Sequence, residues 1–487
     1  MPAKKLILTY VDSLRTDMLE RAVAEGRAPT FGALLERGVL IPDCVSSFPS
    51  VTPVASAEIA TGVASDRHWI SGMNWYHRLE RRYVEYGSSL DATRSVGVFR
   101  ALYDLVYNMN LAHLNPEAET IFERLDDIGA RTACTPFLIY RGRHRHQVSL
   151  DGLLGRAVDL SKLKFRHHTY GPKELFYGDL YASREVPCKS TSIPGMRDPY
   201  SACCAAELIR EDAFDFLLFS LADNDNYSHR HGPEATVESI ARADDGYAQI
   251  VEAGGGIDRF LADHALVLVA DHAQTDVHRG LALADLLARH WRVLAPSDDR
   301  PERAQLAVSP TGRAAHVYLL DGDDGRPDPD RVRQRLVEIE GVDIVCWMEA
   351  GEAVVERQGR RLWFRPGGPI EDARGGDWEL RGDPSAIDAE VAGGVLRCDE
   401  YPDPLARVHA ALASPHAGDF IVSLLTGYEA VDWGGVTHAG GGSHGSLHRG
   451  DSLGPLLFVG CGPEDPGERE QWSLRDVAPA ILEHFGA

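Results

Sequence analysis

The chain has 487 residues, and its 50 basic against 73 acidic side chains give a formal net charge of -23. This charge opposes binding to long nucleic acid and to anionic membrane surfaces, although bound metal ions can still attract a small anionic substrate locally. At the usual ~150 residues per domain the length suggests about three units, and a single enzyme fold with insertions fits equally well.

The N-terminal residues MPAKKLILTYVDS contain too short an apolar run for a signal peptide and lead directly into a predicted strand. No stretch approaches the about 18 apolar residues of a membrane helix, so we expect a cytoplasmic protein without membrane insertion. The eight cysteines show no CxxC spacing. We interpret them as reduced and mostly buried, rather than as metal ligands or a disulfide framework.

Short apolar runs alternate with helical patterns in the first and last thirds of the chain. This alternation is typical of an α/β fold in which helices cover both faces of a mostly parallel sheet. The clearest predicted strands are 6–11, 214–221, 265–270 and 455–459. Helical periodicity predicts helices over 119–127, which Gly129 would end, and over 201–210.

Two stretches depart from this pattern and are predicted to be insertions. Residues 63–200 contain a core-like piece near 130–140 but are otherwise rich in aromatic and cationic side chains, which is typical of substrate walls. Residues 304–415 surround a charged helix near 330–339 and indicate a small α+β lid subdomain. The predicted division is a core of 1–62, 116–140, 200–303 and 416–487, inserted cap segments at 63–115 and 141–199, and the lid at 304–415.

Two predicted strands end in possible metal ligands. Asp12 closes the strand in LILTYVDSLRTD, at the edge where open α/β sheets place their sites, although a lone aspartate there is as readily a solvated one. In LVLVADHAQ, Asp271 and His272 leave a second strand end together, and adjacent oxygen and nitrogen donors suit zinc or manganese. A structural cap is the alternative, but the repeated pattern favours a shared site.

The segment DNDNYSHRHGP offers a second pair of ligands. Asp225 and His229 lie four residues apart, so both can face one ion from a single helical turn or a tight loop. Spacing alone does not rank them above Asp223, Asn226 and His231, and a surface loop is the alternative.

The late segment GGGSHGSLHRGDSLGP places His444 among glycines that let the backbone approach closely. His444 would complete the second metal site, with His438 and His448 as rivals. Glycine-rich loops are also ordinary turns, so this segment is a weak signal by itself.

Thr52 stands in SSFPSVTPVASAEIATG, where Pro53 suits the first turn of a helix that continues through the apolar residues. A hydroxyl there lies at the positive end of the helix dipole, and a bound metal would favour the alkoxide that attacks phosphorus. An ordinary threonine N-cap is the alternative, and Ser47, Ser50 and Ser56 are other possible nucleophiles.

Taken in chain order, these segments resemble the alkaline phosphatase superfamily, and most closely its type I phosphodiesterase/nucleotide pyrophosphatase family. The resemblance covers the core, about half of the chain. It is carried by the first aspartate, by FPSVT with ATG after it, by D-x-x-x-H with HGP, by a strand followed by DH, and by GSHG.

This resemblance implies an alkaline-phosphatase-like doubly wound fold and two divalent metal ions, Zn²⁺ or alternatively Mn²⁺. One ion would be bound by Asp12, Thr52, Asp271 and His272, and the other by Asp225, His229 and His444. Thr52 would attack phosphorus in line, and water would then hydrolyse the phospho-threonine with retention. The metals, about 4 Å apart, would stabilise the entering and leaving oxygens.

The expected activity is that of a metal-dependent phosphodiesterase acting on a small phosphate ester or diester. A phosphomonoesterase or phosphonate hydrolase of the same superfamily is the alternative, and an inert phosphoryl-binding protein is the non-enzymatic one. The sequence disfavours sulfatases, because C/S-x-P-x-R is absent, and serine-dependent phosphoglycerate mutases.

Substrate contacts are less clearly marked in the sequence. Ala55, three residues after Thr52, carries no donor for a phosphoryl oxygen, so we expect a backbone amide or a loop cation to serve. The loop cations considered are Arg141, Arg143 and Arg145; the aromatics Trp75, Tyr76, Tyr83 and Tyr86 are packing residues or base-stacking platforms.

Overall fold

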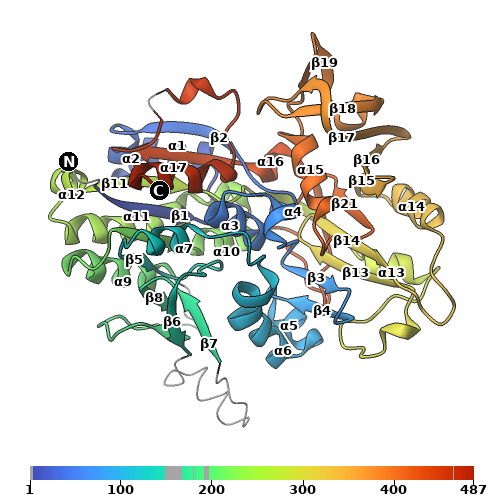
Figure 1. The fold of residues 1–487 in the computed structure, drawn as a ribbon, viewed down its shortest axis with the longest axis horizontal. Coiled ribbons are helices and arrows are strands. Elements are labelled where there is room, and N and C mark those ends of the chain that lie inside the picture. The colour runs from blue at the N-terminus through green and yellow to red at the C-terminus, as the bar shows by residue number, and fades with distance from the viewer. Residues whose placement is uncertain (1–3, 149–166, 179, 191–196, 464) are drawn as a thin grey trace.

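The computed structural model describes residues 4–148, 167–178, 180–190, 197–463 and 465–487. Its main features are two large β-sheets, which Figure 1 shows as separate parts of the molecule: one drawn mainly in blue and green, the other in yellow and orange. The first sheet carries the candidate site on its strand ends.

The first sheet has eight strands, in the order β2-β24-β11-β1-β10-β5-β8-β9. Their bounds are β2 Val39–Val45, β24 Leu453–Val459, β11 His264–Val269, β1 Lys5–Val11, β10 Phe216–Leu221, β5 Thr132–Cys134, β8 Glu174–Tyr177 and β9 Tyr181–Ala182. β1 pairs in parallel with both β10 and β11, and β10 continues in parallel to β5. All four predicted strands are present, and β24 runs antiparallel to its neighbours β11 and β2.

Helices cover both faces of this sheet, as the sequence pattern predicts. The strand period of two sends Leu8 of β1 into one hydrophobic cluster and Ile7 into the other. The cluster around Leu8 holds α3 Thr52–Thr61, α7 Ile121–Asp127 and α17 Val477–Phe485. The cluster around Ile7 holds α1 Thr16–Ala24, α2 Pro29–Leu35, α9 Asp198–Arg210, α11 Val237–Ala253 and α12 Ile257–Asp263. The predicted helices 119–127 and 201–210 correspond to α7 and α9, and Thr120 forms a capping box at the start of α7.

The second sheet has nine strands, in the order β13-β14-β21-β15-β16-β17-β20-β19 with β18 paired to β17. Their bounds are β13 Leu306–Thr311, β14 Ala314–Leu319, β15 Val342–Glu349, β16 Glu352–Arg357, β17 Arg360–Glu371, β18 Asp377–Gly382, β19 Glu390–Ala392, β20 Val395–Arg397 and β21 Phe420–Leu424. The helices α14 Pro329–Glu338 and α15 Pro404–Ala413 pack against β15. The segment 304–415 supplies every strand of this sheet except β21, which lies between β14 and β15.

A small sheet, β22-β12-β23, packs through β22 against β14 and β21 of the second sheet and through β23 against the helix Asp223–His231. Its strands are β22 Gly427–Ala430, β12 Thr275–Leu281 and β23 Gly442–Ser443. The other strands form the pairs β3 Asn74–His77 with β4 Arg82–Glu85 and β6 His144–Gln147 with β7 His168–Gly171. The other helices are α4 Ser65–His68, α5 Leu90–Val96, α6 Val98–Tyr103, η1 Asp104–His113, α10 Asp223–His231, α13 Leu283–Ala288 and α16 Arg449–Ser452, and the short helices η2 Pro233–Ala235, η3 Pro301–Arg303, η4 Pro384–Ile387, η5 Pro466–Glu468 and η6 Leu474–Asp476.

Trp75, Tyr76 and Tyr83 are packing residues in this structure, whereas Tyr86 also lines a cavity together with Thr52. Trp75, Tyr76, Tyr83 and Tyr86 are all buried, and the Trp75 indole donates a hydrogen bond to the Tyr86 hydroxyl. Parts of the predicted cap segment 141–199, namely 149–166, 179 and 191–196, lie outside the described residues. Within the described residues, no helix combines the length and the apolar character needed to cross a membrane.

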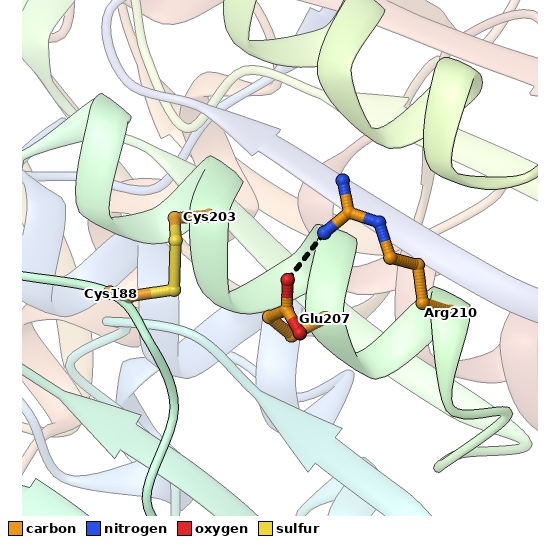
Figure 2. Close-up of a disulfide and its surroundings, with 4 residues drawn as sticks. All are labelled: Cys188, Cys203, Glu207 and Arg210. Carbon is orange, nitrogen blue, oxygen red and sulfur yellow. Dashed lines mark hydrogen bonds and ion pairs between the residues drawn. A yellow bond between two sulfur atoms is a disulfide. The ribbon is translucent and has the colours of Figure 1, made fainter.

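One prediction about the cysteines is wrong. Cys188, in the segment before α9, forms a disulfide with Cys203 on that helix, as Figure 2 shows. The other six cysteines are free. Sequence spacing did not reveal this pair because the two residues are 15 positions apart without a recognisable motif, and only the packing of the segment against α9 brings their Cα atoms to 5.7 Å.

Candidate functional site

The site forms where three neighbouring parallel strands end. β11, β1 and β10 are adjacent in the sheet, and Asp271, Asp12 and the helix α10 follow their respective carboxyl ends. Parallel strands deliver the residues after them to the same edge, which is where open α/β sheets bind ligands. Register therefore brings together residues that are more than 200 positions apart in the chain.

Asp12, Asp271 and His272 form the first group of possible metal ligands. One ligand atom from each lies within 4.8 Å of the others, and all three side chains are buried. The Nε2 atom of His272 is 3.1 Å from Asp271 Oδ2 and 3.9 Å from Asp12 Oδ1. Asp12 Oδ1 has no hydrogen-bond partner in the described part of the chain.

Asp225, His272 and His444 form the second group, again within 4.8 Å of one another. On α10, Asp225 and His229 are one helical turn apart, and His229 Nε2 lies 3.3 Å from Asp225 Oδ1. His444 Nε2 lies 3.6 Å from the same oxygen. The two groups thus share His272, whose ring stacks on that of His444 with 3.7 Å between centroids.

The three histidines present the same nitrogen to the site. The Nδ1 of His229 lies 2.7 Å from the carbonyl of Gly442, that of His444 lies 2.7 Å from the carbonyl of Ser50, and that of His272 lies 3.2 Å from the carbonyl of Ala273. A carbonyl only accepts, so each Nδ1–H donates, and in the neutral rings of His272 and His444 an unprotonated Nε2 faces a carboxylate. A divalent cation between these facing lone pairs would remove their repulsion.

Burial and mutual charge set the protonation of these groups. Burial, and then the charges of Asp271 and Asp225, raise the pKa of Asp12 well above its usual range. Burial also raises the pKa of Asp271 to about 6 and lowers the pKa of His272 to about 4 and that of His444 to about 3. Neutral imidazoles and crowded carboxylates are the expected state of an oxygen- and nitrogen-donor metal site.

Asp225 differs from the other two carboxylates. Burial opposes its ionisation, but His229, His444 and His272 together hold the pKa of Asp225 well below its usual range. Burial also works against a charged His229, yet Asp225 raises the pKa of that imidazole to about 8. Without metal, Asp225 and His229 therefore carry opposite charges at neutral pH.

Thr52 is the first residue of α3, and its hydroxyl faces the shared histidine. Thr52 Oγ1 is 3.3 Å from His272 Nε2, and Val51 rather than Thr52 occupies the N-cap position. The other candidate hydroxyls differ: Ser47 and Ser50 are engaged with backbone carbonyls, whereas Ser56 Oγ is buried without a partner among the described residues. Ser56 lies one helical turn after Thr52.

Three residues without a recognisable motif hold the ligands in place. Tyr10 donates from its hydroxyl to Asp271 Oδ2 at 2.8 Å. Ser13 donates its backbone N–H to Asp271 Oδ1 and its hydroxyl to Asp225 Oδ1, so it connects the two groups. Gln274 donates to Asp225 Oδ1 at 2.6 Å. In the sequence, the only signal for these three residues was their position close to Asp12 or to the pair Asp271 and His272.

His444 is held by a loop that a buried ion pair supports. Gly445, directly after it, has a φ of 119°, and a Cβ there would meet the Thr311 carbonyl at 2.6 Å, so glycine is required. The backbone N–H of Arg313 donates to the His444 carbonyl at 2.6 Å. The side chains of Arg313 and Asp451 are fully buried and 2.5 Å apart.

The rival ligands lie in other environments. His438 Nδ1 is 2.7 Å from Glu429 Oε1, and its ring stacks on that of His229. His448 contacts Glu400 and caps α16. Asp223 pairs with Arg197, and the His231 ring packs against Tyr227.

A cavity of about 310 Å³ opens onto Thr52, Asp12 and Asp225. Its lining includes the apolar residues Met73, Pro136, Phe137 and Leu138 and the polar residues Arg197, Asp223, Asn226 and Arg230. The arginines expected from the sequence do not line it. Arg141 is buried against Glu123 and Arg143 pairs with Asp127, because the loop that carries them packs onto α7.

Known proteins resemble this chain in family pattern and in fold. The family model described as type I phosphodiesterase/nucleotide pyrophosphatase matches residues 6–340. No curated protein sequence matches the chain significantly. Among solved structures, the phosphonoacetate hydrolase from Sinorhizobium meliloti 1021, in complex with phosphonoformate, is similar with a TM-score of 0.54 and 19% identity, covering 99% of this chain and 96% of that one. Murine ectonucleotide pyrophosphatase/phosphodiesterase 5 is similar with a TM-score of 0.56 and 12% identity, covering 99% and 95%.

Proposed function

Because the chain belongs to the type I phosphodiesterase/nucleotide pyrophosphatase family, and so to the phosphoryl ester hydrolases of the alkaline phosphatase superfamily, we propose that it is a metal-dependent phosphodiesterase with Thr52 as nucleophile. The observation that carries this proposal is the position of the Thr52 hydroxyl. It opens onto the cavity and contacts the one histidine that both groups of possible metal ligands share.

The donor set fits two divalent cations. Asp12, Thr52, Asp271 and His272 would hold one ion, and Asp225, His229 and His444 the other. The fit is supported by the unpartnered, buried Asp12 Oδ1 and by the imidazole nitrogens that face carboxylates. Mixed oxygen and nitrogen donors suit Zn²⁺, with Mn²⁺ as the alternative. When bound, such ions lower the pKa of a coordinated hydroxyl and neutralise charge on a phosphoryl group.

The chain's own residues would then perform a double displacement. Thr52 Oγ1 forms a bond to phosphorus while the bond to the ester oxygen breaks and the alcohol leaves. Water hydrolyses the resulting phospho-threonine and restores the hydroxyl. Ser56 is suited to donate to a phosphoryl oxygen, because its buried hydroxyl lines the same cavity and has no partner among the described side chains and backbone.

A phosphonate hydrolase is the second candidate. It is favoured by the modest size of the cavity, about 310 Å³, and by the fold shared with a phosphonoacetate hydrolase over 99% of this chain. The same ligands would serve a phosphorus–carbon substrate, so the two activities differ in the group that leaves.

The test measures p-nitrophenol release from bis-p-nitrophenyl phosphate, p-nitrophenyl phosphate and p-nitrophenyl phenylphosphonate, with zinc, manganese or chelator. We expect the diester to be turned over with metal only, and Thr52→Ala to abolish turnover. Thr61→Ala is the matched control, because Thr61 ends the same helix and bonds the Ala57 carbonyl.

Metal analysis of the same samples separates an enzyme from an inert binding protein. Zinc bound in stoichiometric amount without hydrolysis of any of the three compounds would contradict the proposal and favour the inert alternative. Release of inorganic phosphate from phosphonoacetate, which requires cleavage of its phosphorus–carbon bond, would instead favour the second candidate.

A further inference from the structure

We propose that the cavity beside Thr52 contains a subsite for a second anionic group of the substrate, a carboxylate or phosphate on the part not attacked by Thr52, with Arg230 as the residue that selects it. This inference rests on the proposed function, since it names the substrate class of the same site.

The position of Arg230 follows from the helix that supplies two metal ligands. On α10, Asp225 and His229 are four residues apart and reach the ligand groups. Asn226 and Arg230 each follow one of them by one residue, so they form a second pair with the same spacing on the neighbouring face of the helix. Both line the cavity together with Thr52. A substrate held at Thr52 is therefore within the same cavity as an amide and a guanidinium.

Arg230 is exposed, and no hydrogen bond or ion pair joins its side chain to any other residue in the portions of the chain that the structure describes. Arg197, the other arginine of the cavity, differs because its Nη1 lies 2.9 Å from Asp223 Oδ1, which neutralises it. Among these polar residues of the cavity, Asn226 is a neutral amide, Arg197 and Asp223 form an ion pair, and Arg230 is an exposed cation without a partner among the described residues.

The overall charge makes this cation informative. At a net charge of -23 the chain repels anions over most of its surface, and this repulsion grows with the charge of the substrate. The guanidinium of Arg230 in the cavity lining offsets this repulsion locally. Its planar fork of donors matches the two oxygens of a carboxylate or phosphate, and it offers nothing comparable to a neutral nucleobase or alkyl group.

Apolar residues of the same cavity bear on the part of the substrate between the two anionic groups. Met73, Phe137 and Leu138 line the cavity together with Thr52 and Arg230. We therefore expect an apolar linker between the two groups.

The test compares two p-nitrophenyl phosphodiesters that are identical except at the end of the second alcohol, which carries a carboxylate in one and the uncharged carboxamide in the other. For metal-loaded wild type we expect kcat/KM for the carboxylate compound to be about tenfold higher, mainly through KM. Arg230→Gln removes most of this preference, and Arg230→Lys keeps part of it. Arg210→Gln is the matched control: it removes one exposed cation from α9, where Figure 2 shows it paired with Glu207, and leaves the preference unchanged.

Equal kcat/KM for the two compounds in wild type, or a preference that survives Arg230→Gln, would overturn the subsite. If wild type released p-nitrophenol from neither compound, the proposed function would fail separately. The subsite would then be decided by calorimetric titration with the same two compounds, where tighter binding of the carboxylate that depends on Arg230 supports it and equal binding refutes it.

Discussion

The buried pair of Arg313 and Asp451 gives the sharpest stability prediction. Both side chains are completely shielded from solvent, and Asp451 also accepts hydrogen bonds from the backbone N–H and the hydroxyl of Ser446. Arg313→Met leaves the carboxylate buried without its cation, a change that typically costs about 3–5 kcal/mol. Because the Ser446 and Thr275 hydroxyls still donate to Asp451, we expect the lower end, about 3 kcal/mol.

The assay is equilibrium guanidinium unfolding followed by tryptophan fluorescence. The double variant Arg313→Met/Asp451→Asn is expected to recover at least about 1 kcal/mol, since the buried charge is then removed together with its partner. Arg279→Met is the control: Arg279 pairs with Glu340 at the surface, so the free energy of unfolding is expected to change by less than about 1 kcal/mol.

Two results would refute this reasoning. If Arg313→Met cost less than about 1 kcal/mol, the pair would not support the loop that carries His444. If the double variant were no more stable than the single one, the loss would come from packing of the arginine rather than from the stranded carboxylate.

The remaining predictions concern the disulfide, a buried histidine and a metal ligand's support. Cys203→Ser opens a loop of 15 residues and should lower the free energy of unfolding by about 3 kcal/mol. In a denaturant titration, reductant should abolish the difference between wild type and this variant. Burial lowers the pKa of His316 to about 4 from an ordinary 6.5, and Gly418 N–H donates to its Nδ1, so its stabilisation is complete above pH 6.5 and is lost as pH falls toward about 4. The free energy of unfolding, measured by denaturation between pH 7 and 4.5, should therefore fall less steeply with decreasing pH for His316→Gln than for wild type. An unchanged slope would contradict this. Tyr10→Phe removes the hydrogen bond to Asp271 and should weaken zinc retention about 10-fold in competition with a chelator, while equal retention would argue against that role.

The local elements could be predicted from the sequence because each depends on neighbours in the chain. The apolar run of residues 6–11 is a buried strand, and the strand 264–269 likewise ends just before Asp271. The helix after Thr52 follows from Pro53 and the small apolar residues behind it. These local signals, together with the rule that parallel strand ends share an edge, were enough to indicate one site.

The partners of those residues depended on the tertiary structure. Ser13 and Gln274 belong to no motif, yet each bonds Asp225, because the register of β1, β10 and β11 places them there. The same holds for the cavity wall. Arg141 and Arg143 were plausible substrate contacts by composition, but their loop packs onto α7, and Arg230 lines the cavity instead.

The sequence by itself determined which chemical groups stand at the ends of which strands, since strand and helix formation follow from spacing along the chain. The tertiary structure alone decided that His272 belongs to both ligand groups, that Cys188 meets Cys203, and that Arg230 lines the cavity. Those contacts join positions far apart in the chain. Their geometry is set by strand register and by the packing of helices on the sheet, which no local pattern encodes.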